Sequence, residues 1–384
     1  MQNFTYANPV KIIFGKGSIH KIKEEIAKDQ TVLILYGGGS IKKNGVYSQV
    51  MSAIEGYKVF EFSGIEPNPH YETCMKAVEL IKKEKIDFLL SVGGGSVLDA
   101  TKFIAAATLY DGESWKILSE AALVHRALPF GSVITLPATG SEMNNGGVIT
   151  KAATQEKLAF STAYTFPLFS VLDPETTYSL PKGQIANGVV DTFVHVMEQY
   201  LTTGDDNALL QDCMAEAVAT TIVMQGPQAL LHPSDYDIRA NVMWASTWAL
   251  NGWINCGVEQ DWATHMIGHE LTALFGLDHG QTLAIVYPGL MEVMKDQKAK
   301  KIIRMGKEIF EINEEEDAKQ ITCTIKAVEH FFEKVGIKTR LSDYNLGDED
   351  IDKVVTRLKE RGWKLGEKRN ITPDVVRQIL ELRK

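Results

Sequence analysis

The sequence predicts an α/β domain with a parallel sheet over residues 1–180, followed by an all-helical domain over residues 181–384. In the first half, short apolar runs of buried-strand type alternate with amphipathic helical segments, which is the pattern of a parallel sheet flanked by helices. From about residue 185 onward, long helical stretches follow one another and no run has a strand pattern. The change from alternating strand and helix patterns to helical patterns alone places the domain boundary near residue 180.

The elements of both domains are predicted in chain order. Strands are expected at 31–36 (TVLILY), 87–92 (DFLLSV), 132–139 (SVITLPAT) and 169–174 (FSVLDP). A helix is expected at 71–85, where YETCMKAVELIKKEK follows the segment PNP. After SLPKGQ the pattern changes, and helices are expected over 185–201 and 239–252.

Composition and charge exclude several classes of protein. Hydrophobic residues make up 45% of the chain and charged residues 23%, as in a globular protein with a sizeable core. The formal net charge is −9 and no basic stripe is present, so neither nucleic acid nor an anionic membrane is an expected partner. The sequence has no signal-peptide pattern, no membrane-length apolar run and no CxxC pair, so we expect a cytoplasmic protein.

Two glycine-rich loops follow predicted strands, at LYGGGSIKKNG (35–45) and SVGGGSVLDATK (91–102). Glycine lets the backbone approach a phosphate closely, and the start of a helix offers unpaired N–H groups to it. One such loop alone is more often a plain turn between strand and helix, but two in one sheet favour a bound nucleotide. The first domain is therefore predicted to bind a nucleotide, although neither loop has the GxGxxG spacing of the usual dinucleotide fingerprint.

The first of these loops indicates which dinucleotide fits. An acidic residue at the end of a strand commonly binds the ribose 2′-hydroxyl of NAD. Here the strand ends at Tyr36 and continues into glycines without a carboxylate, and Lys42 and Lys43 follow. These residues leave space and positive charge for a 2′-phosphate, so the sequence favours NADP over NAD.

Histidines and one aspartate at helical spacing indicate a metal site. Asp191 and His195 are four residues apart on one predicted helix, and His265 and His269 repeat that spacing on another. A glycine then provides a natural helix stop, so the chain can turn and bring His279 back toward the same place. One carboxylate with two or three imidazoles suits zinc, iron or a similar divalent ion.

Other interpretations of these residues stay open on spacing alone. An aspartate and a histidine four residues apart often form a surface pair, and a lone H-x3-H pair is often structural. A metalloprotease is excluded by residue order, because HExxH places glutamate directly after the first histidine, whereas Glu270 follows the second.

Taken together, these residues resemble the iron-dependent (group III) alcohol dehydrogenases, most closely their bacterial branch of NADP-dependent butanol dehydrogenases and broad-range aldehyde reductases. The motifs that carry the resemblance are NPVKIIFGKGSI, GGGSVLDATK, TLPATGSEMNN, VLDPETTYSLP, ANGVVDTFVHVMEQY, GLDHGQTLAIVYP and GIKTRLSDYNL. They are spread over nearly the whole chain, and their combination is highly specific.

The resemblance implies a Rossmann-like dinucleotide-binding α/β domain followed by an all-helical metal-binding domain, and it also implies roles for individual residues. The implied metal ligands are Asp191, His195, His265 and His279, and the implied catalytic residue, which faces cofactor and substrate, is His269. The implied cofactor contacts are Gly37, Gly38, Ser40 and Asn68 at the adenosine ribose, Gly94, Gly95, Ser96 and Asp99 at the pyrophosphate, Thr135 and Thr139 beside them, and Lys157 near a ribose. Relatives that prefer NAD carry an acidic residue near position 37, where this chain has glycine.

The activity implied is that of a metal-dependent NADP(H) alcohol dehydrogenase or aldehyde reductase for a small uncharged aldehyde or primary alcohol of the butanal or butanol type. One Fe²⁺ or Zn²⁺ is expected to polarise the carbonyl, and NADPH to supply hydride. The proton is expected from His269, a ribose hydroxyl or water. Four protein ligands usually mark a closed zinc site, so a change of coordination is expected during turnover.

Two alternatives belong to other functional classes. A polyol or polyol-phosphate dehydrogenase of the same superfamily with a phosphate pocket needs Arg or Lys near the metal helices, and residues 185–200 and 255–285 contain neither. A non-catalytic nucleotide-binding sensor is indicated by loss of a metal ligand, and all four positions are filled. We therefore expect a small aldehyde or alcohol as partner, together with a second copy of the chain in a homodimer.

Overall fold

The computed structural model describes residues 1–203 and 207–384. The chain forms two compact units. The sheet unit contains Ala7–Leu180 and Pro233–Thr247, and the helical unit contains Met1–Tyr6, Pro181–His232 and Trp248–Lys384. The predicted fold class, a parallel α/β part followed by an all-helical part, is confirmed. Two segments cross a simple division at residue 180, because Met1–Tyr6 joins the helical unit and Pro233–Thr247 joins the sheet unit.

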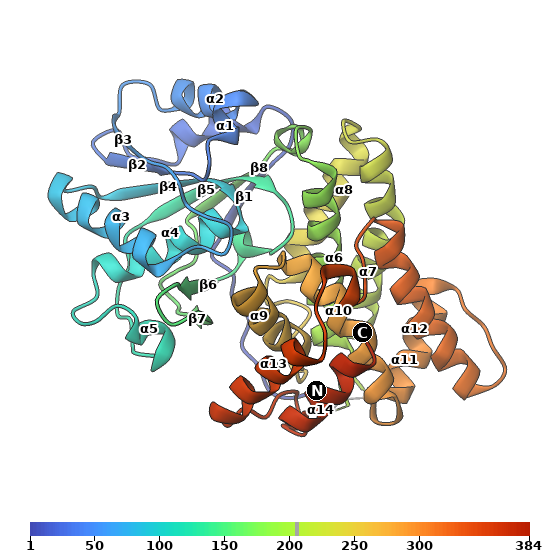
Figure 1. Ribbon diagram of the computed structural model, residues 1–384. Coiled ribbons are helices and arrows are strands. Elements are labelled where there is room, and N and C mark those ends of the chain that lie inside the picture. Colours follow the sequence, from blue (N-terminus) through green and yellow to red (C-terminus); the bar gives the residue numbers. More distant parts are fainter. Residues whose placement is uncertain (204–206) are drawn as a thin grey trace. The chain divides into compact units, whose positions relative to one another are not determined.

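Six parallel strands form the main sheet of the sheet unit, in the order β1-β8-β5-β4-β2-β3 (Figure 1). Their bounds are β1 Lys11–Phe14, β2 Thr31–Leu35, β3 Lys58–Phe62, β4 Phe88–Gly94, β5 Phe130–Leu136 and β8 Phe169–Leu172. The four predicted strands are present as β2, β4, β5 and β8, because each is an apolar run buried on both faces. The short edge strands β1 and β3 lie outside the prediction, as does the antiparallel pair β6 (Gly146–Lys151) and β7 (Glu156–Ser161).

Helices cover both faces of this sheet (Figure 1). Strand side chains alternate between the faces, so Leu33 and Leu35 of β2 join the core beneath α3 and α4, whereas Val32 and Ile34 join the core beneath α1 and α2. The bounds are η1 Ser18–Glu24, α1 Ser40–Lys43, α2 Val46–Ala53, α3 Tyr71–Glu84, α4 Gly95–Thr108, α5 Lys116–Ser119, η2 Ser141–Met143, η3 Pro174–Thr177 and α8 Tyr236–Ala249. The helix predicted at 71–85 is α3, and the helix predicted at 239–252 is α8.

The helical unit is built around α6, whose residues from Gly188 to Tyr200 are all buried. Its bounds are α6 Lys182–Tyr200, α7 Leu209–Leu231, α9 Ala263–Phe275, α10 His279–Val293, α11 Lys295–Phe310, α12 Asp317–Lys334, η4 Ser342–Tyr344, α13 Asp348–Glu360 and α14 Pro373–Glu381. Apart from an isolated bridge between Leu365 and Ile371, the described residues of this unit form no strand, as predicted. None of the described helices is long and apolar enough to cross a membrane.

Three helices of this unit approach one another closely because glycine occupies the contacts. Helix α9 ends at Gly276, which has a left-handed φ of 70°, and α10 begins at His279 after a short turn. At Gly268 of α9, an added Cβ would lie 2.7 Å from the Thr282 hydroxyl of α10. At Gly280 of α10, an added Cβ would lie 2.7 Å from the backbone of α6. Glycine therefore lets the α10 backbone lie directly against the α6 backbone, and lets α9 pack closely on Thr282 of α10.

Candidate active site

Four side chains from these three helices meet around one carboxylate oxygen. Asp191 and His195 lie one turn apart on α6, His265 lies on α9, and His279 is the first residue of α10. The Oδ1 atom of Asp191 is 3.5 Å from Nδ1 of His195, 3.6 Å from Nε2 of His265 and 3.6 Å from Nε2 of His279. The structure thus brings together the four residues predicted as metal ligands, and their binding of a metal stays a prediction.

The arrangement of these atoms fits a divalent ion. The ligand atoms of Asp191, His195 and His265 lie within 4.8 Å of one another, and His279 stands outside that mutual group. Two atoms bound about 2.1 Å from one ion at tetrahedral angles lie about 3.4 Å apart, close to the spacings around Asp191 Oδ1. Oδ1 of Asp191 and Nε2 of His265 are buried and have no hydrogen-bond partner among the described residues. Buried polar atoms are rarely left so, and a cation between them satisfies both.

His269 lies one turn after His265 on α9 and is buried. Its ring centroid is 5.4 Å from that of His279, and the His265 ring lies 5.3 Å from the same imidazole. His279 therefore has both α9 histidines as ring neighbours, with His265 toward Asp191. The catalytic role of His269 stays a prediction.

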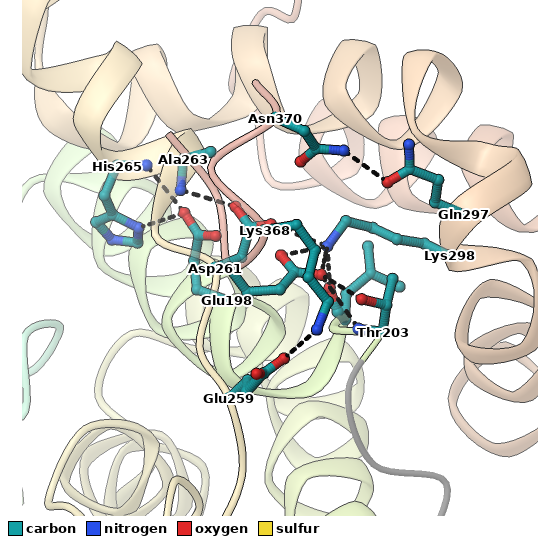
Figure 2. Close-up of polar contacts among 12 residues, drawn as sticks. Glu198, Thr203, Glu259, Asp261, Ala263, His265, Gln297, Lys298, Lys368 and Asn370 are labelled. Carbon is teal, nitrogen blue, oxygen red and sulfur yellow. Dashed lines mark hydrogen bonds and ion pairs between the residues drawn. The ribbon is translucent and has the colours of Figure 1, made fainter. Parts of the chain in front are cut away.

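Glu198 is a further residue of this site, which the sequence analysis does not identify. One of its carboxylate oxygens, Oε1, accepts a hydrogen bond from the backbone N–H of His265 at 2.9 Å and lies 3.1 Å from Nδ1 of the same residue (Figure 2). Burial lowers the pKa of His265, but its contacts with Asp191 and Glu198 outweigh burial and raise that pKa. Glu198 follows Asp191 by seven residues and His195 by three, so helical periodicity is the pattern that places it on the same face of α6.

A buried ion-pair network lies behind Glu198 (Figure 2). The Asp261 carboxylate accepts hydrogen bonds from the backbone N–H of Ala263 at 2.8 Å and from Nζ of Lys298 at 2.9 Å. Lys298 also donates to the carbonyl of Leu201 at 2.6 Å and to both oxygens of Glu367 at 3.1 Å. Because Leu201 directly follows α6 and Ala263 begins α9, this network fixes the end of one helix against the start of the other.

Glu270, which follows His269, has a structural partner rather than a metalloprotease geometry. Its carboxylate forms buried ion pairs with Arg357, at 2.8 Å, and with Arg361. Both arginines belong to the segment at and just after α13, so Glu270 holds α9 against that segment. The glutamate that follows the second histidine thus has a structural role in packing.

The two glycine loops of the sheet unit differ in what requires glycine. An added Cβ at Gly95, the first residue of α4, would lie 2.5 Å from the side chain of Thr139. At Gly37 it would lie 3.2 Å from a backbone carbonyl oxygen. At Gly38 it would meet nothing within 4 Å, and this position has no left-handed φ. Packing therefore accounts for Gly95, whereas neither packing nor backbone conformation requires glycine at position 38, where cofactor contact stays a prediction.

Some of the remaining residues predicted to contact the cofactor form hydrogen bonds within the protein, and the others are located here by their place in the fold. Asp99 is engaged internally, because its two carboxylate oxygens accept hydrogen bonds from the Ser141 hydroxyl at 2.7 Å and from the Val148 N–H at 3.0 Å. Lys157 and Asn68 are brought together, since the lysine Nζ donates to the amide oxygen at 2.8 Å. Thr135 is buried in β5, Thr139 follows that strand, Gly94 ends β4, Ser96 lies in the first turn of α4, and Ser40 begins α1.

Two lysines of the sheet unit have partners that the sequence does not reveal. Nζ of Lys42, a residue predicted to face a 2′-phosphate, lies 3.0 Å from a carboxylate oxygen of Glu61. The fully buried Lys102 donates to the Asn144 side-chain oxygen at 2.8 Å and to the Gly146 carbonyl at 2.7 Å. Burial lowers the pKa of Lys102 to about 7. Lys102 thus holds α4 to the start of β6 and to the residues just before it.

Comparisons with known proteins identify the family of this chain. Residues 9–174 match the iron-containing alcohol dehydrogenases, and residues 185–383 match the C-terminal part of the same family. The chain belongs to the iron-containing alcohol dehydrogenase family. It is 52% identical over 385 residues to the NADPH-dependent aldehyde reductase YqhD of Escherichia coli, with 99% of each chain covered. The resemblance inferred from the sequence motifs is therefore confirmed.

Solved structures of this alcohol dehydrogenase family have the same fold. The crystal structure of E. coli YqhD has a TM-score of 0.98 at 51% identity, covering 100% of this chain and 99% of that chain. NADH-dependent butanol dehydrogenase A of Thermotoga maritima has a TM-score of 0.95 at 40% identity, with the same coverage. Since one named relative uses NADPH and the other NADH, family membership alone does not determine the dinucleotide.

Proposed function

We propose that this chain is an NADPH-dependent, metal-containing alcohol dehydrogenase and aldehyde reductase for small uncharged aldehydes and primary alcohols. The observation that carries the proposal is the set of three imidazole nitrogens at 3.5 to 3.6 Å from the buried Asp191 Oδ1. The proposal is further supported by the 52% identity, over nearly the whole chain, to an NADPH-dependent aldehyde reductase.

In this proposal Asp191, His195, His265 and His279 hold one divalent ion, Fe²⁺ or Zn²⁺. When bound, the ion supplies Lewis acidity to a carbonyl oxygen, and the dinucleotide supplies hydride. The buried side chains of the first three residues exclude water from their side of the centre. His279 is the most open of the four, with 23% of its side chain exposed, which supports placing the substrate on its side.

The surroundings support an uncharged substrate. The Trp262 ring lies 5.1 Å from that of His265, so one wall of the site is aromatic. Three cations of the helical unit that contact the α9 region are already paired, since Lys298 forms an ion pair with Asp261, and Arg357 and Arg361 form ion pairs with Glu270. A phosphate or carboxylate on the substrate therefore finds no available partner in these contacts. We assign His269, beside His279, to hold and deliver the proton.

The choice of NADPH rests mainly on what the first glycine loop lacks. No carboxylate stands at Gly37 or Gly38, so no acidic side chain there repels a 2′-phosphate. The contribution of Lys42 is smaller than its charge suggests, because Glu61 already pairs with it. The proposed preference for NADPH thus rests more on the absence of a carboxylate that would repel the 2′-phosphate than on attraction by Lys42.

Metal removal and replacement test the proposal. The purified enzyme is stripped with a chelator, its metal content is measured by mass spectrometry, and NADPH oxidation is followed with butanal. We expect activity to be lost with the metal and to return with Fe²⁺, Zn²⁺ or Mn²⁺. The Asp191→Asn variant should stay metal-poor and inactive in every metal. Full turnover by protein shown to be metal-free would overturn the proposal.

A homodimer and a cytoplasmic location also belong to the proposal. All four cysteines are free, which supports a reducing compartment. Light scattering of the purified chain tests the dimer, and a mass corresponding to one chain would contradict it.

A further inference from the structure

Two N–H groups of His265 converge on a single oxygen of Glu198. The backbone N–H donates to Oε1 at 2.9 Å, and Nδ1 of the ring lies 3.1 Å from the same atom (Figure 2). The side chains of both residues are almost completely buried, with 7% of His265 and 2% of Glu198 exposed. Water therefore does not compete for this contact.

The contact determines which ring nitrogen of His265 faces the metal centre. A carboxylate accepts hydrogen bonds and donates none, so Nδ1 carries the proton. In the neutral ring Nε2 then presents its lone pair, and this atom is the one 3.6 Å from Asp191 Oδ1. A second donor on the same residue, the backbone N–H, fixes the carboxylate relative to the helix as well as to the ring.

Glu198 itself is held in place from two directions. It lies on α6, on the face that also presents Asp191 and His195, so its distance from those ligands is set by the helix. Its backbone carbonyl accepts a hydrogen bond from the N–H of Asp261 at 2.8 Å, and Asp261 is tied to Lys298 at 2.9 Å. The backbone that carries the Glu198 carboxylate is thus fixed both by α6 and by the hydrogen bond from Asp261.

We propose that Glu198 is the positioning residue of the metal centre, which selects the Nδ1–H form of His265 and directs its Nε2 toward Asp191. The inference rests on the proposed metal site, but it concerns a residue outside the predicted ligand set. Partners of this kind orient a ligand and raise its basicity, and losing one weakens metal binding about 10- to 100-fold.

The test compares three substitutions at two buried glutamates of the helical unit. Glu198→Gln keeps the volume and an acceptor oxygen but removes the charge, and Glu198→Ala removes both. Glu270→Gln is the control, because it changes a buried glutamate of α9 whose partners are the α13 arginines. Each protein is loaded with Co²⁺, and its affinity is measured by chelator competition together with the visible absorption spectrum of the bound ion.

We expect Glu198→Ala to bind Co²⁺ about 10- to 100-fold more weakly with an altered spectrum, and Glu198→Gln to fall between it and the unmodified protein. Glu270→Gln should lower the melting temperature and leave affinity and spectrum unchanged. If Glu198→Ala does not fold, Glu198→Gln decides the question alone, because it keeps the shape of the side chain. Unchanged Co²⁺ affinity and spectrum in the Glu198 variants, or an equal change in Glu270→Gln, would overturn the inference. Failure of the unmodified protein to bind any divalent metal would instead overturn the proposed function.

Discussion

Replacing Gly95 by alanine tests whether packing, rather than the cofactor, requires glycine at the start of α4. The added Cβ would lie 2.5 Å from both Cγ2 and Oγ1 of Thr139. Ordinary contacts between such atoms are about 3.5–4.0 Å, so the helix and the loop after β5 must separate by about 1 Å. Overpacking of this kind costs about 1–3 kcal/mol of folding free energy. For a unit of this size, that corresponds to a fall in melting temperature of about 2–12 °C.

Gly38→Ala is the matched variant, because nothing lies within 4 Å of its added Cβ and its backbone is not left-handed. Its free energy of unfolding should stay within about 0.5 kcal/mol of the unmodified value. If the adenosine ribose of NADPH lies against this glycine, the methyl group collides with the ligand. A clash of about 1–3 kcal/mol weakens NADPH binding roughly 5- to 150-fold.

The assay combines thermal unfolding of the cofactor-free proteins with a fluorescence titration of NADPH. We expect the effects to separate, with Gly95→Ala melting lower and Gly38→Ala melting normally but binding NADPH weakly. A Gly95→Ala variant that melts like the unmodified protein would refute the packing argument. A Gly38→Ala variant with normal NADPH affinity would show that the cofactor does not approach the first loop closely.

Three further predictions concern the site and the stability of the helical unit. His265→Ala should lose metal and activity together, whereas His269→Ala should keep about one metal per chain and lose rate roughly 10²- to 10⁴-fold; metal analysis beside kinetics checks this, and the reverse pattern would contradict the assignment. Gly37→Asp should shift kcat/KM from NADPH toward NADH, and equal values for both cofactors in the unmodified enzyme would count against the NADPH proposal. Burial alone would raise the pKa of Glu329, but the hydrogen bond and charge of Arg383 outweigh it and hold that pKa below its usual 4.5. The ionised Glu329 carboxylate therefore stabilises the folded protein above pH 4.5, and this stabilisation is lost as the pH falls further. Glu329→Gln should be less stable than the unmodified protein at neutral pH and nearly equal to it in acid. Denaturant unfolding at each pH checks this prediction.

Local sequence patterns predict the central strands of the fold and some of the residues that share a helix face, whereas the full set of proposed metal ligands follows from the family resemblance. Strands such as 87–92 are recognisable because they are buried on both faces and therefore continuously apolar. Asp191 and His195 are recognisable because helical spacing requires them to share a face. The edge strands β1 and β3 are short and only half buried, as their mixed burial shows, so no apolar run identifies them.

Contacts between distant parts of the chain are what the sequence does not reveal. The partner of His265 is Glu198, which is 67 residues away, and nothing in the local sequence of either residue indicates the pairing. The sequence suggests that Lys42 is an available positive charge, but in the structure it forms an ion pair with Glu61 of β3. Asp99 of the second loop is predicted to contact the cofactor, and the sequence does not show that both its oxygens also accept hydrogen bonds from within the protein. In each case tertiary pairing changes the chemistry that the residue type suggests.

Charge gives a second reason to expect the proposed metal centre to depend on Glu198 as well as on its ligands. The ligand set contains a single carboxylate, Asp191, and neutral imidazoles, so a divalent ion bound to it alone leaves one net positive charge in a buried place. Uncompensated buried charge is strongly unfavourable. The Glu198 carboxylate, in contact with the far nitrogen of His265, brings the total of two carboxylates and one divalent ion to zero. Its position serves geometry and charge together, because the same oxygen that orients the ring also neutralises the centre. This double role is the reason that the amide of Glu198→Gln, which keeps only the acceptor, should restore only part of the metal affinity.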